Sequence, residues 1–500
     1  MTSLCLAPAT GDRRLDQATG YAPALPLRDY QKEGVAKMAD RKAFALLMAM
    51  RTGKSATLLA DFGAKEKAGE VDDLLVVAPA GCYRTWVGEI EKHASADLRS
   101  RLRVHVWESG NKSQSYKKAL QRFLGNPVGP RAFLVNVEAL SVAKAGAREA
   151  CEEFLAPKRS MMVVDEVTVI KNPQAIRTKY VNRVLAPRAD YRRILSGLPT
   201  PRSPLDLYCE FEFLDPAILR QRSYFGFTQR YAIVRQTTFG GKLKRPANIV
   251  VGYRNEDELR RLIEPHSFRV EFRPDIPSTY TFREVELTIE QRRIYDDLKR
   301  SATAELAAMS HVTAPIVIVR LLRLHQVLCG HVVDEDGTEH SFPERRTPAL
   351  MELLDDYAGK AIIWCSYDAD VRKVAIAIEN EYGAGSVARF WGGNAATRET
   401  EEVAFKTDPG CRFMVATPAA GGRGRTWDGA NLVVYYSSTN NLEHRDQSEQ
   451  RAQNVGKKVG VDYVDLIAPG TVDGLIIKAL RDKIDMASVI TGDNYRDWLI

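Results

Sequence analysis

The feature that most constrains the fold of this chain is a series of short apolar segments that alternate with amphipathic stretches of helical periodicity. In the first half of the chain these segments are residues 43–50, 74–78, 132–137 and 161–164. Continuous apolar runs of strand length are typical of parallel strands that are buried on both faces. The pattern therefore predicts an α/β fold in which helices cover a parallel sheet.

The alternation stops after about residue 204 and resumes later in the chain. Residues 205–330 are mostly helical in pattern, and strand-sized runs return at 361–367, 386–391, 412–418, 431–437 and 461–468. Two α/β blocks separated by a helical stretch predict two lobes. We expect a flexible tail at 1–26, a first lobe at 27–280 with a basic helical protrusion at about 205–262, a second lobe at 281–485 with a helical segment at about 288–330, and a tail at 486–500.

The composition excludes several other classes of protein. Of the 500 residues, 45% are hydrophobic and 27% are charged, which supports folded cores and argues against wholesale disorder. No apolar run approaches the ~20 residues of a membrane-spanning helix, and the N-terminus lacks the pattern of a secretory signal. The seven cysteines are scattered without a CxxC pair, as in reducing compartments. We therefore expect a soluble cytoplasmic protein with no membrane partner.

A strand-to-helix junction at residues 51–55, Arg-Thr-Gly-Lys-Ser, has the composition of a phosphate-binding loop. Backbone amides at the start of a helix bind anions. Gly53 permits close approach of the backbone, Lys54 supplies a positive charge to the β- and γ-phosphates, and the Ser55 hydroxyl can hold Mg²⁺. Met48 stands where the full pattern G-x-x-x-x-G-K-[ST] has glycine, so the placement between strand and helix carries the interpretation.

A second acidic motif follows about 110 residues later, where the apolar run 161–164 ends in Asp165 and Glu166. Magnesium-dependent phosphoryl transfer to water needs a carboxylate that holds the metal and a group that orients the attacking water. The alternative is a solvated acidic turn. Because a phosphate loop precedes the pair, we favour the catalytic interpretation.

The order of these and further motifs resembles the Swi/Snf-type ATPases of helicase superfamily two. The matching segments are LRDYQKEGV at 27–35, MAMRTGKS at 48–55, LLVVAPAGCYRTWVGEIEKH at 74–93, VVDEVTVIKN at 163–172, LSGLPTPRSPLDLYCEFEFLDP at 195–216, AAGGRG at 419–424 and QSEQRAQ at 447–453. The resemblance implies two RecA-like lobes that use ATP and Mg²⁺. It is closest to the short forms found in bacteria and their viruses, which implies the cytoplasm of a bacterium or of an infected host cell.

The resemblance also implies roles for individual residues. Lys54, Asp165, Glu166, Gln447 and Arg451 would be catalytic, with Glu166 activating water and Arg451 neutralising charge on the γ-phosphate. Ser55 and Asp165 would hold Mg²⁺. The nucleotide would contact Arg28, Gln31, Thr52, Gly53, Lys54, Ser55 and Gly424, and DNA would contact Pro79, Arg84, Thr417 and Gly422.

One segment is unusually basic. Residues 216–255 contain eight Lys or Arg side chains and no Asp or Glu, with six aromatic residues interleaved. Basic side chains on phosphates give sequence-independent, salt-sensitive binding. We expect the aromatic residues to form the core of a small subdomain, and we expect DNA contacts from Arg230, Arg235, Lys242, Lys244 and Arg245.

One departure from the family pattern bears on activity. Motif VI of the family carries two arginines, and here Arg451 occupies the first position and Asn454 the second. A neutral amide does not neutralise phosphate charge. Arg451 could act alone, or Lys457, Lys458 or Arg425 could compensate.

We expect a DNA translocase that couples ATP hydrolysis to remodelling of forks, branched DNA or bound proteins in replication, recombination or repair. It would act on duplex or branched DNA without sequence preference, as a monomer when free, with replication or recombination proteins as possible partners. The alternatives are a nucleotide-gated DNA clamp with little turnover and an RNA helicase of the same superfamily.

Overall fold

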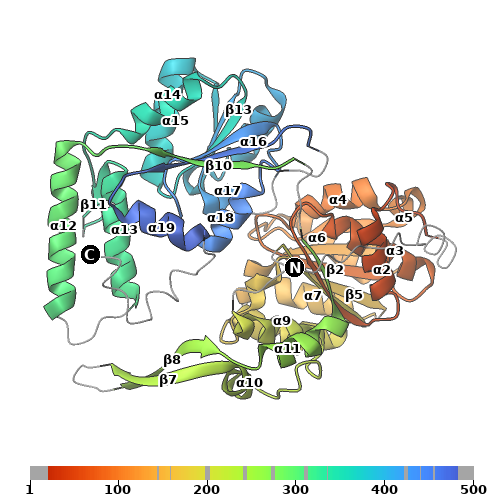
Figure 1. Cartoon of the computed structure of the whole chain (residues 1–500). Helices are drawn as coiled ribbons and strands as arrows, with labels where there is room; N and C mark the ends of the chain where they lie inside the picture. Colours follow the sequence, from red (N-terminus) through yellow and green to blue (C-terminus); the bar gives the residue numbers. More distant parts are fainter. Residues whose placement is uncertain are drawn as a thin grey trace. The chain divides into compact units, whose positions relative to one another are not determined.

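The computed structural model describes residues 21–142, 146–157, 159–197, 203–239, 245–271, 276–308, 314–334, 336–421, 426–439, 441–453 and 457–481 (Figure 1). The chain divides into two compact units. The first comprises residues 1–233 and 252–272, and the second comprises residues 234–251 and 273–500.

The first unit is built on a seven-stranded sheet in which every pairing is parallel. The strands lie in the order β3-β4-β2-β5-β6-β1-β9. Their bounds are β1 (Ala43–Met48), β2 (Asp73–Ala78), β3 (Arg103–Val106), β4 (Arg131–Asn136), β5 (Ser160–Val164), β6 (Tyr191–Ser196) and β9 (Ser267–Val270). The central strands β2, β4 and β5 are buried along their whole length, as the continuous apolar runs predict.

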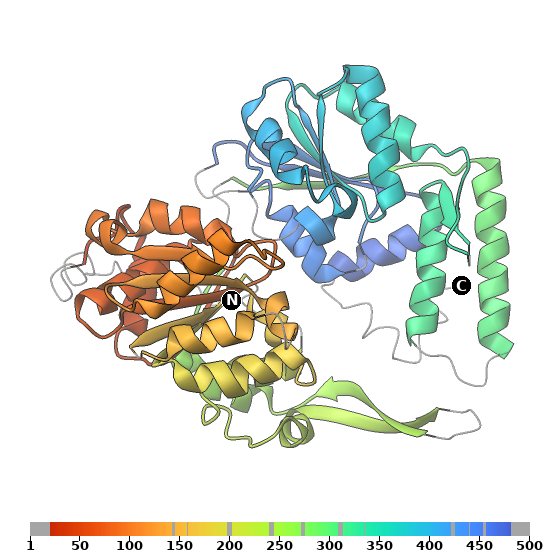
Figure 2. The same cartoon turned by 180° about the vertical axis from the view of Figure 1, so that it is seen from behind.

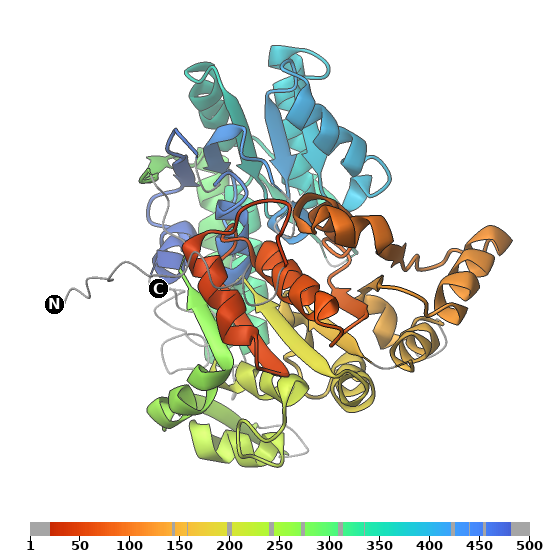
Figure 3. The ribbon, with the colours of Figure 1, turned by 90° about the vertical axis from the view of Figure 1, so that its right-hand side faces the viewer.

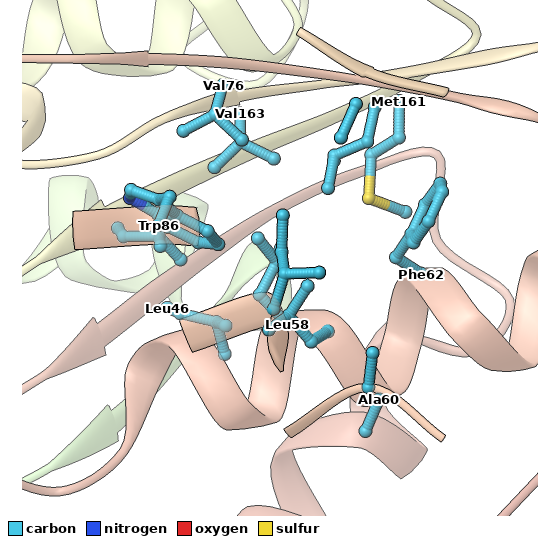
Figure 4. Packing of buried hydrophobic residues seen from close by; sticks show 14 of the residues in the cluster. Leu46, Leu58, Ala60, Phe62, Val76, Trp86, Met161 and Val163 are labelled. Carbon is cyan, nitrogen blue, oxygen red and sulfur yellow. The ribbon is translucent and has the colours of Figure 1, made fainter. Parts of the chain in front are cut away.

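Helices cover both faces of this sheet. They are α2 (Asp29–Met38), α3 (Lys54–Lys67), α4 (Thr85–His93), α5 (Ala96–Arg101), α6 (Gln114–Gly125), α7 (Ala147–Leu155), α8 (Ile176–Tyr180) and α9 (Leu207–Leu214). Figure 3 shows α2 beside α3 and the edge strand β9. Because side chains alternate along a strand, Leu46, Val76 and Val163 pack against α3 and α4 on one face (Figure 4), while Phe133 contacts α6 and α7 on the other.

The region expected to be a helical protrusion contains helices and a β-hairpin. The helices are α10 (Tyr224–Tyr231) and α11 (Glu256–Ile263), and between them β7 (Ala232–Phe239) and β8 (Arg245–Tyr253) form a two-stranded sheet (Figure 2). The expectation of helix is therefore wrong for 232–239 and 245–253. Both strands contain β-branched residues at a density that favours strand. The expected aromatic core holds for only part of the six residues: Phe227 and Tyr231 are buried with ring centroids 4.7 Å apart, whereas Phe225 and Tyr253 are exposed.

The second unit has its own parallel sheet, in the order β10-β17-β16-β13-β15-β14. The strands are β10 (Thr279–Glu284), β13 (Lys360–Trp364), β14 (Val387–Phe390), β15 (Phe413–Ala416), β16 (Ala430–Tyr435) and β17 (Asp462–Ile467). The helices around it are α14 (Arg346–Asp355), α15 (Asp368–Tyr382), α16 (Arg398–Thr407), α17 (Pro418–Gly421), α18 (Leu442–Glu449) and α19 (Val472–Arg481). Two parallel α/β sheets confirm the predicted pair of RecA-like lobes.

Two further helices, α12 (Ile289–Ala308) and α13 (Ala314–Leu328), lie within the stretch 288–330 that the sequence predicts to be helical. Together with α19 they enclose a separate apolar cluster that includes Tyr295, Leu324 and Ile476. The hairpin of β11 (His331–Val333) and β12 (Glu339–Ser341) follows α13. The sequence places the start of the second lobe at residue 281, and β10 of the second sheet begins at Thr279. Among the described residues, no helix has the length and apolarity that a membrane crossing requires.

A buried ion pair joins β2 to β4 in the first lobe. Arg131 is fully buried and donates through Nε and Nη2 to the Asp73 carboxylate at 2.9 and 2.6 Å. The guanidinium also donates to the carbonyl oxygens of Phe123 and Leu124 on α6. Burial raises the pKa of Asp73, although its hydrogen bonds from Arg131 lower it. The buried charge of either residue therefore needs the other residue as its partner.

We predict that Arg131→Met lowers the free energy of unfolding of the first lobe by about 3–5 kcal/mol, because it leaves the Asp73 charge buried without a partner. Urea denaturation measures the change. Arg260→Met removes the exposed pair with Asp257 and is the control, with an expected loss below about 1 kcal/mol. A loss from Arg131→Met as small as that of the control would contradict this account of the pair.

Candidate active site

The carboxyl ends of three neighbouring strands bring the predicted catalytic segments together. Strand β6 lies between β5 and β1, and all three run parallel. The loop 49–53 follows β1, Gly197 follows β6, and Asp165 with Glu166 follows β5. Parallel strands end at one edge of the sheet, where open α/β folds bind ligands. The phosphate loop and the acidic pair therefore share one edge, although more than 100 residues separate them.

The loop after β1 is shaped for anion binding. Gly53 has φ 82° and caps the N-terminus of α3, so that Lys54 is the first helical residue. Arg51 also has a positive φ, of 68°. Thr52 closes the turn because its hydroxyl donates to the carbonyl oxygen of Ala49 at 2.7 Å. The first amides of α3 and the positive end of its dipole therefore face the loop.

Gln31 on α2 holds the phosphate loop from the side. Its Nε2 donates to the carbonyl oxygen of Thr52 at 2.9 Å, and its Oε1 accepts from the amide of Arg28 at 2.8 Å. A Cβ atom on Gly53 would lie 2.1 Å from Gln31 Nε2. The amide group still keeps one N–H and one lone pair for a base edge. Glycine at 53 is thus required both by its φ and by the close approach of Gln31.

Asp165 is held from two sides. Its Oδ2 accepts a hydrogen bond from the indole Nε1 of Trp86 at 3.0 Å, and its Oδ1 accepts from the amide of Glu166 at 2.9 Å. Burial and the neighbouring Glu166 carboxylate raise the pKa of Asp165 to about 6, while the charge of Lys54 and the indole hydrogen bond lower it. Glu166 is buried and has a φ of 49°. It is the N-cap of the 3₁₀ turn Val167–Ile170.

Gly197 is a further residue of this edge. A Cβ atom there would lie 3.4 Å from Lys54 Nζ and 2.8 Å from Met50 Cγ. A side chain at 197 would therefore enter the space beside the lysine ammonium. Sequence reasoning did not single out Gly197 or the contact of Trp86 with Asp165, because both depend on how β5, β6 and α4 come together.

The donor groups at this edge suit Mg²⁺ and a triphosphate. Mg²⁺ prefers carboxylate and hydroxyl oxygens and keeps several waters, and Asp165 and Ser55 supply such oxygens. The Lys54 side chain makes no hydrogen bond or ion pair with any other residue in the described part of the chain, although its charge acts on Asp165. Its ammonium group is therefore available to an anion.

The predicted residues of motif VI lie in the second unit, around α18. Arg451 is buried, and its Nε donates to the carbonyl oxygen of Gln447 at 2.8 Å. Gln447 Nε2 donates to Glu443 at 3.2 Å. Arg445, which sequence reasoning missed, binds the Asp465 carboxylate through Nη2 at 2.9 Å and packs over the ring of Tyr435. Arg445 therefore has a structural role that anchors α18 to the sheet.

Lys457 does not compensate for a second arginine. Its ammonium donates to the carbonyl oxygens of Asp428, Ala430 and Ala452 at 2.9, 2.6 and 2.7 Å. These three bonds use all three of its protons. Burial lowers the pKa of Lys457 to about 8, although nearby Asp428 raises it. Lys457 thus joins the segment before β16 to the segment after α18.

The residues nominated for DNA contact differ in exposure. Arg84 and Arg235 are exposed. Arg84 donates to the Tyr83 hydroxyl at 3.0 Å and lies 3.9 Å from the Glu108 carboxylate. Arg230 is exposed but pairs with Glu258. Pro79 and Thr417 are buried, so they offer little surface.

Several positions named in the sequence analysis lie outside the described residues. They are Lys242, Lys244, Gly422, Gly424, Arg425 and Asn454. The backbone of Arg245 starts β8, and its side chain is not among those described.

A phosphate-loop motif and an acidic pair on the carboxyl edge of a parallel sheet are features of nucleotide-binding α/β proteins. A family model described as "SNF2-related domain" matches residues 30–331, which is more than half of the chain. The chain therefore belongs to the SNF2-related family. This match confirms the resemblance to Swi/Snf-type ATPases.

Individual relatives are distant. The chain is 25% identical over 375 residues to the TATA-binding protein-associated factor mot1 of Aspergillus fumigatus, covering 66% of this chain and 20% of that protein. It is 22% identical over 469 residues to the SWI/SNF-related matrix-associated actin-dependent regulator of chromatin subfamily A-like protein 1 of Xenopus tropicalis, covering 92% of this chain and 44% of that protein. The chain thus spans less than half the length of these relatives.

A solved structure, the Sulfolobus solfataricus SWI2/SNF2 ATPase core in complex with dsDNA, is also similar. It is 22% identical, with a TM-score of 0.42, and the match covers 94% of each chain.

We predict that Gly53→Ala lowers the affinity for ADP at least about tenfold, since the left-handed φ costs about 1–2 kcal/mol in a residue with a Cβ and the methyl group displaces Gln31. Equilibrium titration with a fluorescent ADP analogue measures this. Gly69→Ala is the matched control, because Gly69 also has a positive φ but has no atom near its Cβ position and lies beyond α3. Equal affinity in Gly53→Ala and wild type would show that the loop does not bind nucleotide as described.

We predict that Lys457→Met lowers the thermal denaturation midpoint of the second lobe, because three carbonyl oxygens lose their donor at about 1 kcal/mol or more each. Differential scanning calorimetry follows the transition. The exposed Lys458→Met serves as the control and should leave the midpoint unchanged. If Lys457→Met keeps the wild-type midpoint, the structural role of Lys457 is wrong.

Proposed function

We propose that this protein is a DNA-stimulated ATPase that converts ATP hydrolysis into movement along DNA. The observation that carries the proposal is the shared edge of β1, β6 and β5, which places Lys54 close enough to Asp165 to lower its pKa. The proposal is also supported by membership of the SNF2-related family.

In this proposal, residues of the first lobe bind ATP and Mg²⁺ and activate the attacking water. Gln31 and the backbone at Arg28 hold the base end of ATP, and the amides of 52–55 with Lys54 bind the phosphates. Ser55 and Asp165 hold Mg²⁺, which supplies charge neutralisation on the β- and γ-phosphates when it is bound. Glu166 accepts a proton from the attacking water.

We further propose that Arg451 of the second lobe neutralises the charge that develops on the γ-phosphate. Gln447, whose carbonyl oxygen binds Arg451 Nε, supports this arginine. The second motif VI position is the neutral Asn454, and the Lys457 ammonium is bound to three carbonyl oxygens. Neither residue therefore supplies a second cation beside Arg451. Arginine fingers contribute about 10³–10⁵ to the rate in related phosphoryl transfers.

DNA is the proposed polymer. The exposed Arg84 and Arg235, together with the basic composition of 216–255, support binding to a phosphate backbone without sequence preference. We propose that the protein acts as a monomer in the cytoplasm of a bacterium or infected host cell, remodelling forks, branched DNA or bound proteins during replication, recombination or repair, where proteins of those processes would be its partners.

The second candidate function is a DNA clamp that binds ATP with little turnover, and the absence of a second motif VI arginine favours it. The two functions differ in the rate of hydrolysis once ATP is bound. An Asn454→Arg variant separates them, because it adds the missing charge. A large gain in turnover on this substitution would favour the clamp.

We predict that duplex or forked DNA stimulates ATP hydrolysis by the wild-type chain more than RNA does. Lys54→Ala and Arg451→Lys should each lower the rate at least about 100-fold. Lys54→Ala removes a positive charge from the phosphates, and Arg451→Lys keeps a charge but loses the planar guanidinium with its paired donors. The measurement is steady-state ATPase activity with duplex, fork, junction, single-stranded DNA and RNA at one stated salt concentration. Lys117→Ala, at an exposed position of α6, is the control, with wild-type activity expected. Stimulation by RNA alone would favour the RNA helicase alternative.

A further inference from the structure

Trp86 makes a contact that core packing does not require. It lies in the first turn of α4, is 1% exposed, and packs in the core close to Val76 and Val163 (Figure 4). Its indole N–H points out of this apolar cluster and donates to Asp165 Oδ2 at 3.0 Å. By contrast, the buried Trp364 of the second lobe has no acceptor for its indole N–H in the described part of the chain. This protein therefore buries a tryptophan elsewhere without such a bond.

The indole bond completes the orientation of the Asp165 carboxylate. Oδ1 is held by the amide of Glu166, and the Asp165 amide itself donates to the carbonyl oxygen of Val77 at 2.9 Å. A carboxylate oxygen has two lone pairs, so Oδ2 can accept the indole and still face a cation. Groups that hold metal ligands in this way affect metal affinity.

The same helix connects Asp165 to the segment 79–85. The carbonyl oxygen of Pro79 accepts from the amides of Cys82 and Tyr83, and the Thr85 hydroxyl donates to the carbonyl oxygen of Cys82 at 2.6 Å. These bonds form a tight turn that leads directly into α4. Arg84, the exposed cation of this turn, is two residues from Trp86. The turn and the indole that holds Asp165 are therefore joined through the first turn of α4.

We propose that Trp86 is a positioning residue for Asp165, and that through it the segment 79–85 sets the metal affinity of the nucleotide site. The proposal rests on the proposed ATP function of that site. It assigns to Trp86 a role in orienting a ligand and gives a physical route by which a polyanion on Arg84 alters Mg²⁺ binding.

The test compares Trp86→Phe with wild type in the full-length protein. Trp86→Phe keeps an aromatic ring in the core and removes the N–H donor. Trp107→Phe is the matched control, since Trp107 is a buried tryptophan of the same lobe whose indole donates to the Ser109 hydroxyl. A second variant carries 3-benzothienylalanine at position 86, which keeps the bicyclic shape and lacks only the N–H.

The readout is the Mg²⁺ concentration that gives half-maximal enhancement of binding of a fluorescent ADP analogue, with binding in EDTA as the metal-free reference. Trp86→Phe and the benzothienyl variant should raise this concentration about tenfold, as loss of such a supporting group does in metal sites. Binding in EDTA should stay as in wild type. Short duplex DNA should shift the Mg²⁺ dependence of wild type more than that of either variant.

Three results would overturn the proposal. One is an unchanged Mg²⁺ dependence in both position-86 variants. Another is an equal loss of binding with and without Mg²⁺, which would show a purely structural role. The third is a shift in Trp107→Phe as large as that in Trp86→Phe. Failure of the proposed function gives a different result, in which wild type itself binds no ADP analogue in any condition.

Discussion

The parallel register of β5, β6 and β1 is the constraint on which the rest of the first lobe depends. Strand β6 separates β1, which leads into the phosphate loop, from β5, which ends before Asp165. Gly197 follows β6 and lies beside Lys54. Parallel strands need crossover connections, so helices must cover both faces and the strands must be apolar throughout. The continuous apolar runs of the sequence are therefore the cause of the arrangement that brings distant charges together.

Those charges interact because the edge is partly withdrawn from water. Burial alone would favour a protonated Asp165, and Lys54 and the Trp86 indole oppose this by favouring the carboxylate. Gln31 holds the loop by donating to the carbonyl oxygen of Thr52, and the amides at the start of α3 are not used by this bond. In the second lobe, Arg445 binds the Asp465 carboxylate and Lys457 binds three carbonyl oxygens, so both charges serve the fold.

The two-lobe α/β fold could be predicted from the strand and helix periods of the sequence. The candidate phosphate loop and the acidic pair could be located because each is a short motif at the end of an apolar strand. The Trp86–Asp165 bond joins residues 79 positions apart, and no local signal marks it. The helical prediction for 205–330 rested on Arg-rich segments that follow the hairpin, and no local signal separated β7 and β8 from them. The sequence allowed Lys457 to replace the second arginine, because its three carbonyl partners come from the tertiary structure.

The account's central claim is that the edge formed by β1, β6 and β5 binds a nucleotide through Lys54 and a metal through Asp165. A crystal structure of the full chain with Mg²⁺ and ADP tests it most directly. We expect the β-phosphate against the amides of 52–55 and the Lys54 ammonium, with the ion on the Ser55 and Asp165 side. A nucleotide bound away from this edge, or bound there with Lys54 turned away from its phosphates, would contradict the account.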